Sequence, residues 1–139
     1  MFLPLELIAR PRAAPPEDTV TDIHPAQPRH LTVRHLVRDG VRIVALRGEL
    51  DHSARDFAEE ALKPPADDTP PRTVADLTDL TFMDSSGINA LIVAHRAAVE
   101  AQGWLRVAGM RPSVLRVIQI VGVDALISCR PTVRQALEK

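Results

Sequence analysis

The sequence contains few of the residues on which thiol, metal and stacking chemistry depend. Its 139 residues include one cysteine, one tryptophan and no tyrosine, and its five histidines show no metal-ligand spacing. The single Cys129 excludes an intramolecular disulfide and any closely spaced pair of thiolate ligands. The scarcity of aromatic rings disfavours binding of nucleic acids through base stacking. We therefore expect no metal, no cofactor and a reducing environment.

Charge and hydropathy exclude two further classes of partner. Lys and Arg number 17 against 18 Asp and Glu, which gives a formal net charge of -1 and no basic footprint for nucleic acid. No apolar run is long enough to span a bilayer, and the first ten residues lack the basic start of a signal peptide. We expect a cytoplasmic protein that binds neither nucleic acid nor membrane, and the sequence leaves its oligomeric state open.

Proline divides the chain into an arm and a domain. Six of the 12 prolines lie in residues 1–29, where they remove backbone donors and disfavour helix. The composition predicts a flexible, proline-rich N-terminal arm over residues 1–29 and a single domain over residues 30–139. The arm contains one apolar cluster, Phe2–Ile8, which is suited to docking on the domain or on a partner.

Apolar periodicity in the domain predicts strands and helices in the order ββαβαβαβα. Two apolar runs flank Asp39-Gly40, a pair that favours a hairpin turn. Ser53 and Asp56 have the spacing of a capping box before the first helix. The predicted strands are 31–37, 41–46, 73–77 with a continuation towards residue 82, 104–108 and 125–128, and the helices lie near 53–62, 86–102, 112–121 and 133–138. This alternation predicts an α/β fold with four helices and a mostly parallel sheet of four to five strands.

The stretch Asp79–Ala98 has the pattern of a strand end, a polar turn and an amphipathic helix. Asp84, Ser85 and Ser86 offer side-chain oxygens that suit a helix N-terminus, and Gly87 lets the chain turn without a Cβ clash. An apolar stripe is predicted at helical spacing over Ile88, Leu91, Ile92, His95 and Val99. A serine is therefore offered where a strand ends and a helix begins, the edge at which open α/β sheets place ligand and partner sites.

Three segments of the domain carry a family resemblance. GELDHSA at 48–54, DLTFMDSSGINALI at 79–92 and RPSVLRVIQIVGVDAL at 111–126 are similar to those of STAS domains. More narrowly, they resemble the bacterial anti-sigma-factor antagonists, also called anti-anti-sigma factors. The likeness covers about residues 31–138 and leaves out the arm.

The resemblance implies a switch by phosphorylation and no catalysis. In that family the anti-sigma factor, a serine kinase, phosphorylates the second serine of the DSSG turn, which is Ser86 here, with Ser85 as the alternative. The unphosphorylated form binds the kinase and frees the sigma factor, and a PP2C-type phosphatase resets the switch. The family's acidic positions fall on Asp51 and Asp84. The partner-binding residues expected are Asp51, Asp84, Ser85, Gly87, Asn89 and Val93.

Simpler interpretations stay open. Ser86 can be an ordinary N-cap, Asp51 can cap the first helix, and Asn89 and Val93 can belong to a solvated helix face. A serine hydrolase is disfavoured because the turn is D-S-S-G and no relay histidine or acid is identifiable. Nucleotide binding lacks a P-loop or a glycine fingerprint. The main alternative is a non-switching STAS scaffold subunit of a stress-sensing or transport assembly.

Overall fold

One six-stranded sheet carries the fold in the computed structural model, which describes residues 30–67 and 69–138. The predicted arm over residues 1–29 lies outside the described residues. The strands are β1 (Leu31–Arg38), β2 (Val41–Leu50), β3 (Arg72–Asp76), β4 (Leu80–Met83), β5 (Trp104–Ala108) and β6 (Ser128–Arg130). The helices are α1 (Arg55–Leu62), α2 (Ser85–Glu100), α3 (Pro112–Val121) and α4 (Val133–Ala136), with 3-10 turns η1 (His52–Ala54) and η2 (Val123–Ala125).

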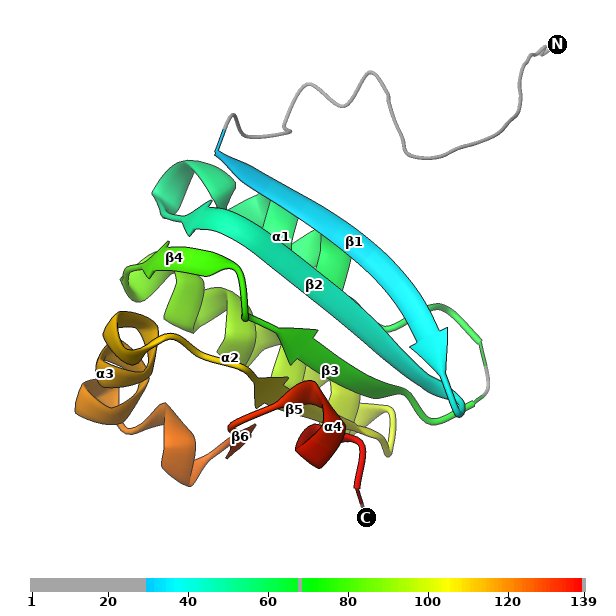
Figure 1. Cartoon of the computed structure of the whole chain (residues 1–139). Coiled ribbons are helices and arrows are strands. Elements are labelled where there is room, and N and C mark those ends of the chain that lie inside the picture. Colours follow the sequence, from blue (N-terminus) through cyan, green and yellow to red (C-terminus); the bar gives the residue numbers. More distant parts are fainter. Residues whose placement is uncertain (1–29, 68, 139) are drawn as a thin grey trace, which may run out of the picture.

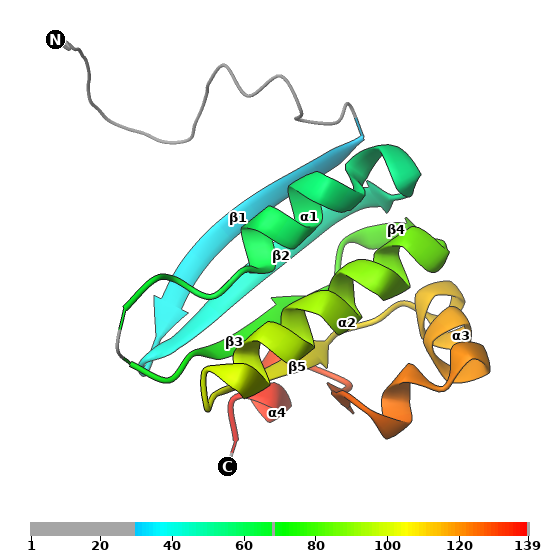
Figure 2. The ribbon, with the colours of Figure 1, turned by 180° about the vertical axis from the view of Figure 1, so that it is seen from behind.

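The sheet is a hairpin joined to a parallel array. β1 and β2 are antiparallel, and their turn places Asp39 at φ 54° and Gly40 at φ 77°, as a two-residue hairpin requires. The strand order is β1-β2-β3-β5-β6, β4 also pairs with β2, and every pairing after the hairpin is parallel. Helices α1 and α2 lie side by side over one face (Figure 2), while α4 lies over the other face (Figure 1). The predicted α/β class and the hairpin are confirmed.

The predicted third strand is split in two. The prediction of one strand from 73 continuing towards 82 is wrong, because the chain breaks between β3 and β4. At the break, the Asp76 carboxylate accepts the backbone N–H of Thr78 at 3.0 Å and also its hydroxyl, which turns the chain. β2 then pairs with β3 along its first half and with β4 along Gly48–Leu50. The sheet therefore has six strands instead of four to five.

The last strand also differs from the prediction. A strand was expected at 125–128, but β6 begins at Ser128 and pairs with β5. The residues before it continue from α3 into η2, which buries Val123, and the buried Ile127 then leads into the strand. Val123 and Ile127 pack into the core before the strand starts, so the strand begins only at Ser128. Apolar periodicity alone does not distinguish such core packing from strand pairing.

The larger core lies between the sheet and the pair α1 and α2. Ile88 and Leu91 of α2 are buried as predicted, but Val99 is 52% exposed, so the predicted stripe is wrong at its end. Three alanines of α2, at positions 90, 94 and 98, are buried instead. Small side chains allow a helix to lie close to its neighbours, and this approach rotates the buried face away from Val99.

Arg42 of β2 joins the sheet to the end of α1. Its guanidinium donates hydrogen bonds to the carbonyls of Ala61 at 2.9 Å, Leu62 at 2.9 Å and Lys63 at 3.0 Å. These are carbonyls that the last turn of a helix leaves without partners. Burial lowers the pKa of Arg42 from its usual value. The cation therefore holds the C-terminus of α1 on the sheet.

Candidate functional site

Two aspartates follow paired residues on neighbouring strands. In the parallel pairing of β2 with β4, Leu50 lies opposite Met83, and Asp51 and Asp84 come next in each strand's direction. Both acids have nearly the same extended backbone, at φ -111° and ψ -170° for Asp51 and at φ -112° and ψ -164° for Asp84. The carboxyl ends of these two strands thus present two acids at one edge of the sheet.

Each acid caps the turn that follows it. The Asp51 carboxylate accepts the backbone N–H of Ser53 at 3.0 Å and the Ser53 hydroxyl at 2.7 Å. These hydrogen bonds, the hydroxyl's first, lower the pKa of Asp51 from its ordinary value. The predicted capping box of Ser53 with Asp56 is wrong, because Ser53 donates back to Asp51 and α1 begins only at Arg55.

Asp84 is the N-cap of α2. Its carboxylate accepts the backbone N–H of Ser86 at 2.8 Å, and its carbonyl accepts from Gly87 at 3.0 Å and from Ile88 at 3.2 Å. Aspartate is among the best N-caps because it satisfies donors that the first turn leaves unpaired and its charge suits the positive end of the helix dipole. The interpretation of Ser86 as an ordinary N-cap is therefore wrong, since Ser86 contributes its N–H and not its oxygen.

The Ser86 hydroxyl is open to solvent. Ser86 is half-buried, and its hydroxyl makes no hydrogen bond within the described part of the chain. In residues 30–67 and 69–138, the buried side-chain polar atoms without a hydrogen-bond partner belong to Arg42, Arg55 and His95. Because the unbonded Ser86 oxygen is not among them, water reaches it. Ser85, one residue earlier, is exposed. Both serine hydroxyls are therefore accessible to a second protein.

The expected contact residues fall on two sides of α2. Asn89 and Val93 are exposed, with Val93 at 41% exposure, and they lie on one face of the helix with Ser85. Gly87 was expected on the same surface, but it is buried, and a Cβ there would meet the side chains of Met83 and Leu50. Close packing under the helix start explains a glycine at this position.

Sequence reasoning missed an aromatic side chain beside the site. Phe82 of β4 is 46% exposed, two residues before Asp84. Its neighbour Met83 is buried, so Phe82 points away from the core. The apolar pattern of the strand does not reveal that this aromatic side chain faces solvent beside the polar turn.

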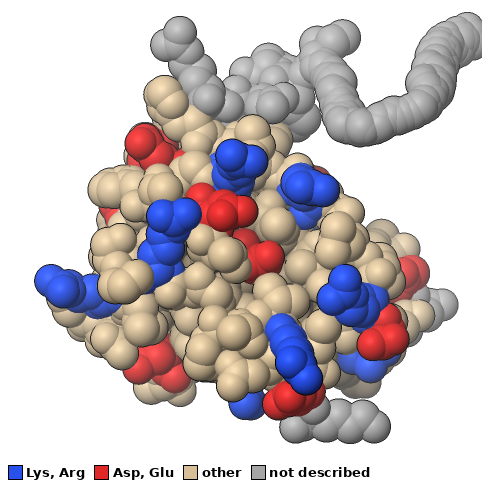
Figure 3. Space-filling model, in the orientation of Figure 1, with Lys and Arg blue, Asp and Glu red and all other residues tan. Residues whose placement is uncertain are grey.

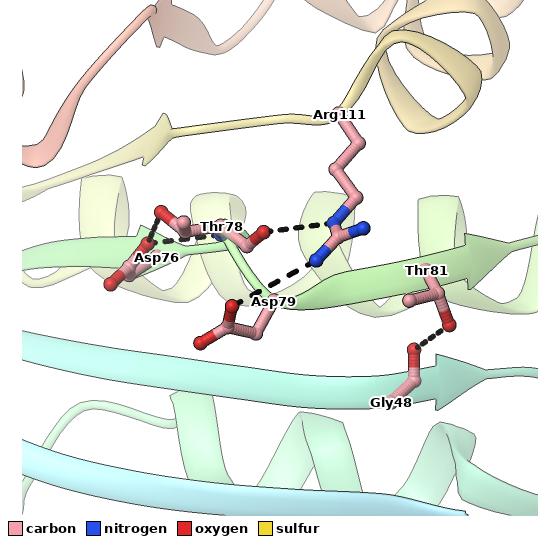
Figure 4. Close-up of polar contacts among 6 residues, drawn as sticks. All are labelled: Gly48, Asp76, Thr78, Asp79, Thr81 and Arg111. Atoms are coloured by element: carbon pink, nitrogen blue, oxygen red, sulfur yellow. Dashed lines mark hydrogen bonds and ion pairs between the residues drawn. The ribbon is translucent and has the colours of Figure 1, made fainter.

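A polar network holds the strand that leads into the site (Figure 4). Arg111, at the start of α3, donates from Nε to the Thr78 carbonyl at 3.1 Å, and its Nη2 lies 3.9 Å from Asp79 Oδ1. The Thr81 hydroxyl donates to the Gly48 carbonyl at 3.0 Å. These contacts tie the break between β3 and β4 to the start of α3, and they tie β4 to β2. Arg111, the first residue of the 111–126 segment that resembles STAS domains, therefore helps to position the site.

The comparison with known families decides the classification. The STAS domain family model matches residues 33–136 of this chain. This chain belongs to the STAS domain family. The resemblance of the GELD and DSSG segments is thereby confirmed.

Relatives of this STAS domain carry a shared name. The Anti-sigma F factor antagonist of Paenibacillus polymyxa is 32% identical over 88 residues, which are 60% of this chain and 73% of the relative. The crystal structure of an anti-sigma factor antagonist from Mycobacterium paratuberculosis has a TM-score of 0.69 at 29% identity, covering 77% of this chain and 91% of the other. The murine Slc26a9 anion transporter matches at a TM-score of 0.64 and 17% identity, over 81% of this chain and 22% of the transporter. That last likeness shows the fold alone.

Other features of this STAS domain lie away from Ser86. A hollow of about 370 Å³ between α1 and α2 is lined by Glu59, Glu60 and Val93 among others, and Ser86 does not line it. In the described ranges, no three His, Cys, Asp or Glu residues are grouped so as to hold a metal ion. No helix of the described residues combines the length and apolar character that crossing a membrane requires.

Proposed function

We propose that this STAS domain is an anti-sigma-factor antagonist whose binding is switched at Ser86. In the unphosphorylated state it binds an anti-sigma serine kinase and thereby releases the sigma factor. The observation that carries the proposal is the solvent-open Ser86 hydroxyl on the first turn of a helix that Asp84 already caps. The relatives named anti-sigma factor antagonists support the same function.

The switch itself is a change of charge. The kinase transfers the terminal phosphoryl group of ATP to the Ser86 oxygen, which loses its proton, and ADP leaves. The phosphoserine carries about -1.5 to -2 charges near neutral pH. The helix dipole and the N–H groups of the first turn favour an anion at this end of α2, so the fold tolerates the modification.

The phosphate on Ser86 weakens binding of the anti-sigma kinase instead of unfolding the domain. Asp51 and Asp84 already present two carboxylates at this edge of the sheet. A phosphate between them raises the local negative charge and the size of the side chain at once. A kinase surface that fits a neutral hydroxyl is then repelled. A PP2C-type phosphatase restores binding by hydrolysing the phosphate ester with water.

The contact surface combines polar and apolar groups. Ser85, Asn89 and Val93 lie four residues apart along α2, and all three are exposed. The exposed Phe82 flanks the start of the helix. A central apolar contact with polar groups around it is typical of interfaces that bind specifically. We assign Phe82 and Val93 as the apolar contacts and Asp51, Ser85 and Asn89 as the polar ones.

Phosphorylation in vitro tests the proposal. The full chain is incubated with ATP and an anti-sigma kinase encoded beside it in the genome, and the product is analysed by intact-mass and fragment mass spectrometry. We expect one phosphoryl group on Ser86, none on a Ser86→Ala variant and normal incorporation in Ser113→Ala, whose serine lies in the first turn of α3 outside the assigned contacts and serves as the matched control. Phosphate on Ser85 alone would show that Ser85, and not Ser86, is the phosphorylated residue. Absence of phosphate with a kinase that binds the chain would leave the scaffold subunit as the function.

A further inference from the structure

The second face of the sheet is only partly covered. Helix α4 packs its Ala136 with Val41, Ile43, Val74 and Ala108, so it covers one part of this face. Beyond that cluster, an open hollow of about 220 Å³ lies against β1, β2 and the break after β3. Figure 3 shows this side of the molecule, where acidic side chains lie between basic ones. The hollow shares Ile43 with that cluster, and its other lining residues include Arg34, Leu36, Ala45, Arg47, Asp76 and Asp79.

The hollow has an apolar floor and a rim of two arginines and two aspartates, of which only the aspartates have side-chain partners among the described residues. Leu36 is 42% exposed although it lies in the interior of an eight-residue strand. The two acids of the rim have partners, since Asp76 accepts from Thr78 and Asp79 pairs with Arg111. The side chains of Arg34 and Arg47 make no hydrogen bond or ion pair within residues 30–67 and 69–138. An occupant with apolar side chains and one carboxylate fits this combination.

We infer that the segment Phe2–Ile8 of this same chain docks in the hollow. The segment reads FLPLELI, which provides five large apolar side chains and one acid, Glu6. It is the apolar cluster of the arm, and neither the fold nor the Ser86 switch uses it. Apolar burial supplies the driving force, and Glu6 supplies the carboxylate that Arg34 and Arg47 lack.

The connection to the domain places this segment within reach. The arm joins the domain at the start of β1, and the hollow runs along β1 past Arg34 and Leu36. From His30 to Arg34 the strand covers about 13 Å. The segment is linked to the domain by 21 residues, 9–29, and a chain of that length has an average end-to-end distance of at least about 25 Å. Such a tether holds the segment at an effective concentration of about millimolar, so even a weak contact is populated.

Solution NMR of the full chain tests this docking. A Phe2→Ser/Leu5→Ser/Ile8→Ser variant is compared with the unaltered chain, and Val20→Ser/Ile23→Ser is the control within the same arm. We expect the amide resonances of Arg34, Leu36, Ala45 and Arg47 to shift in the triple variant and to stay in place in the control. Dilution is expected to leave the resonances of the unaltered chain unchanged, because the contact is intramolecular.

Two results would overturn the docking. Identical resonances in the triple variant and the unaltered chain would mean that the hollow stays empty. Resonances that move on dilution would mean that a second copy of the chain occupies it. A charge exchange provides an independent check: Glu6→Lys and Arg47→Glu are each expected to reproduce the shifts at Leu36 and Ala45, and the combined variant is expected to reverse them. Failure of the combined variant to reverse them would remove Glu6 from the proposed contact.

Discussion

The Asp84 carboxylate accepts the backbone N–H of Ser86 at 2.8 Å, while the Ser86 hydroxyl beside it is unbonded within the described residues. The Asp84 carboxylate therefore caps α2, while the Ser86 hydroxyl is left for a partner. Because they are separate, a change at the Ser86 oxygen affects binding without removing the cap. The same geometry makes stability and function separable by single substitutions.

The first prediction concerns the charge state of Ser86. Ser86→Asp is expected to weaken binding of the anti-sigma kinase by at least about 100-fold, or about 2.7 kcal/mol. The free energy of unfolding is expected to change by less than about 1 kcal/mol, since an acid is favourable in the first turn of a helix. Calorimetric titration and thermal unfolding measure the two effects, and Ser113→Asp is the matched control, since Ser113 is an exposed serine in the first turn of α3 and outside the assigned contact surface. Unchanged binding by a folded Ser86→Asp variant would contradict the switch. Loss of folding in that variant would contradict the claim that the start of α2 tolerates a negative charge.

The second prediction concerns the cap itself. Asp84→Ala is expected to lower the free energy of unfolding by about 1 kcal/mol, because the N–H of Ser86 loses its acceptor. Asp84→Asn keeps an oxygen acceptor without the charge and is expected to retain most of the stability. Urea unfolding of the three proteins measures the difference. Equal stability of all three would show that the 2.8 Å contact contributes nothing.

The third prediction concerns the cation under α1. Arg42→Met is expected to destabilise the domain by about 2 to 3 kcal/mol, because carbonyls of Ala61, Leu62 and Lys63 lose their donor. Arg38→Met, at an exposed position of β1, is the control and is expected to change stability by less than about 0.5 kcal/mol. Urea unfolding checks both values. If the two variants are equally stable, Arg42 does not anchor the helix.

The fourth prediction concerns the end of α2. After this helix the positive φ, at 66°, belongs to Gln102 and not to Gly103. Gly103 is required for another reason, since a Cβ there would clash with the Pro71 carbonyl, which accepts the N–H of Trp104 at 2.8 Å. Gly103→Ala is expected to cost about 1 to 3 kcal/mol, whereas Gln102→Gly is expected to gain up to about 1 kcal/mol. Thermal unfolding that ranks the two variants in the opposite order would refute this account.

The fifth prediction concerns the loss of folding stability at low pH. Burial, and then the positive charge of Arg42, lower the pKa of His35 below 6.5. The unfolded chain then binds this proton more readily than the folded domain does, so stability is full above about pH 6.5 and falls as the pH decreases towards the lowered value. His35→Gln is expected to reduce the loss of stability between about pH 7.5 and about pH 5.5. Urea unfolding at both pH values checks this, and an unchanged slope in the variant would exclude His35 as the source.

Local patterns were sufficient for several features. The pair Asp39-Gly40 predicts its hairpin because only a few residues adopt two successive positive φ angles. The string from Phe82 to Gly87 predicts a helix start, since acid and small polar residues satisfy its free donors. These features depend on residues that are adjacent in the sequence, so they can be predicted from it.

Other features depend on groups that meet only in the folded chain. Nothing in the sequence around Arg42 indicates that its side chain reaches the end of α1, 19 to 21 residues later. The break after β3 also involves a distant group, since the Gly48 N–H donates to the Asp79 carbonyl at 3.1 Å.

The sequence alone therefore determined the α/β class, the family and the segment that contains the accessible serine. It did so because short-range propensities and motif strings are written in consecutive residues. Only the tertiary structure decided which oxygen caps the helix, which hydroxyl stays free and which part of the sheet remains uncovered. The uncovered part of the sheet depends on packing between residues tens of positions apart. The choice of cap depends on which of several neighbouring oxygens the backbone conformation at Asp84 directs at the helix start, and chain periodicity encodes neither outcome.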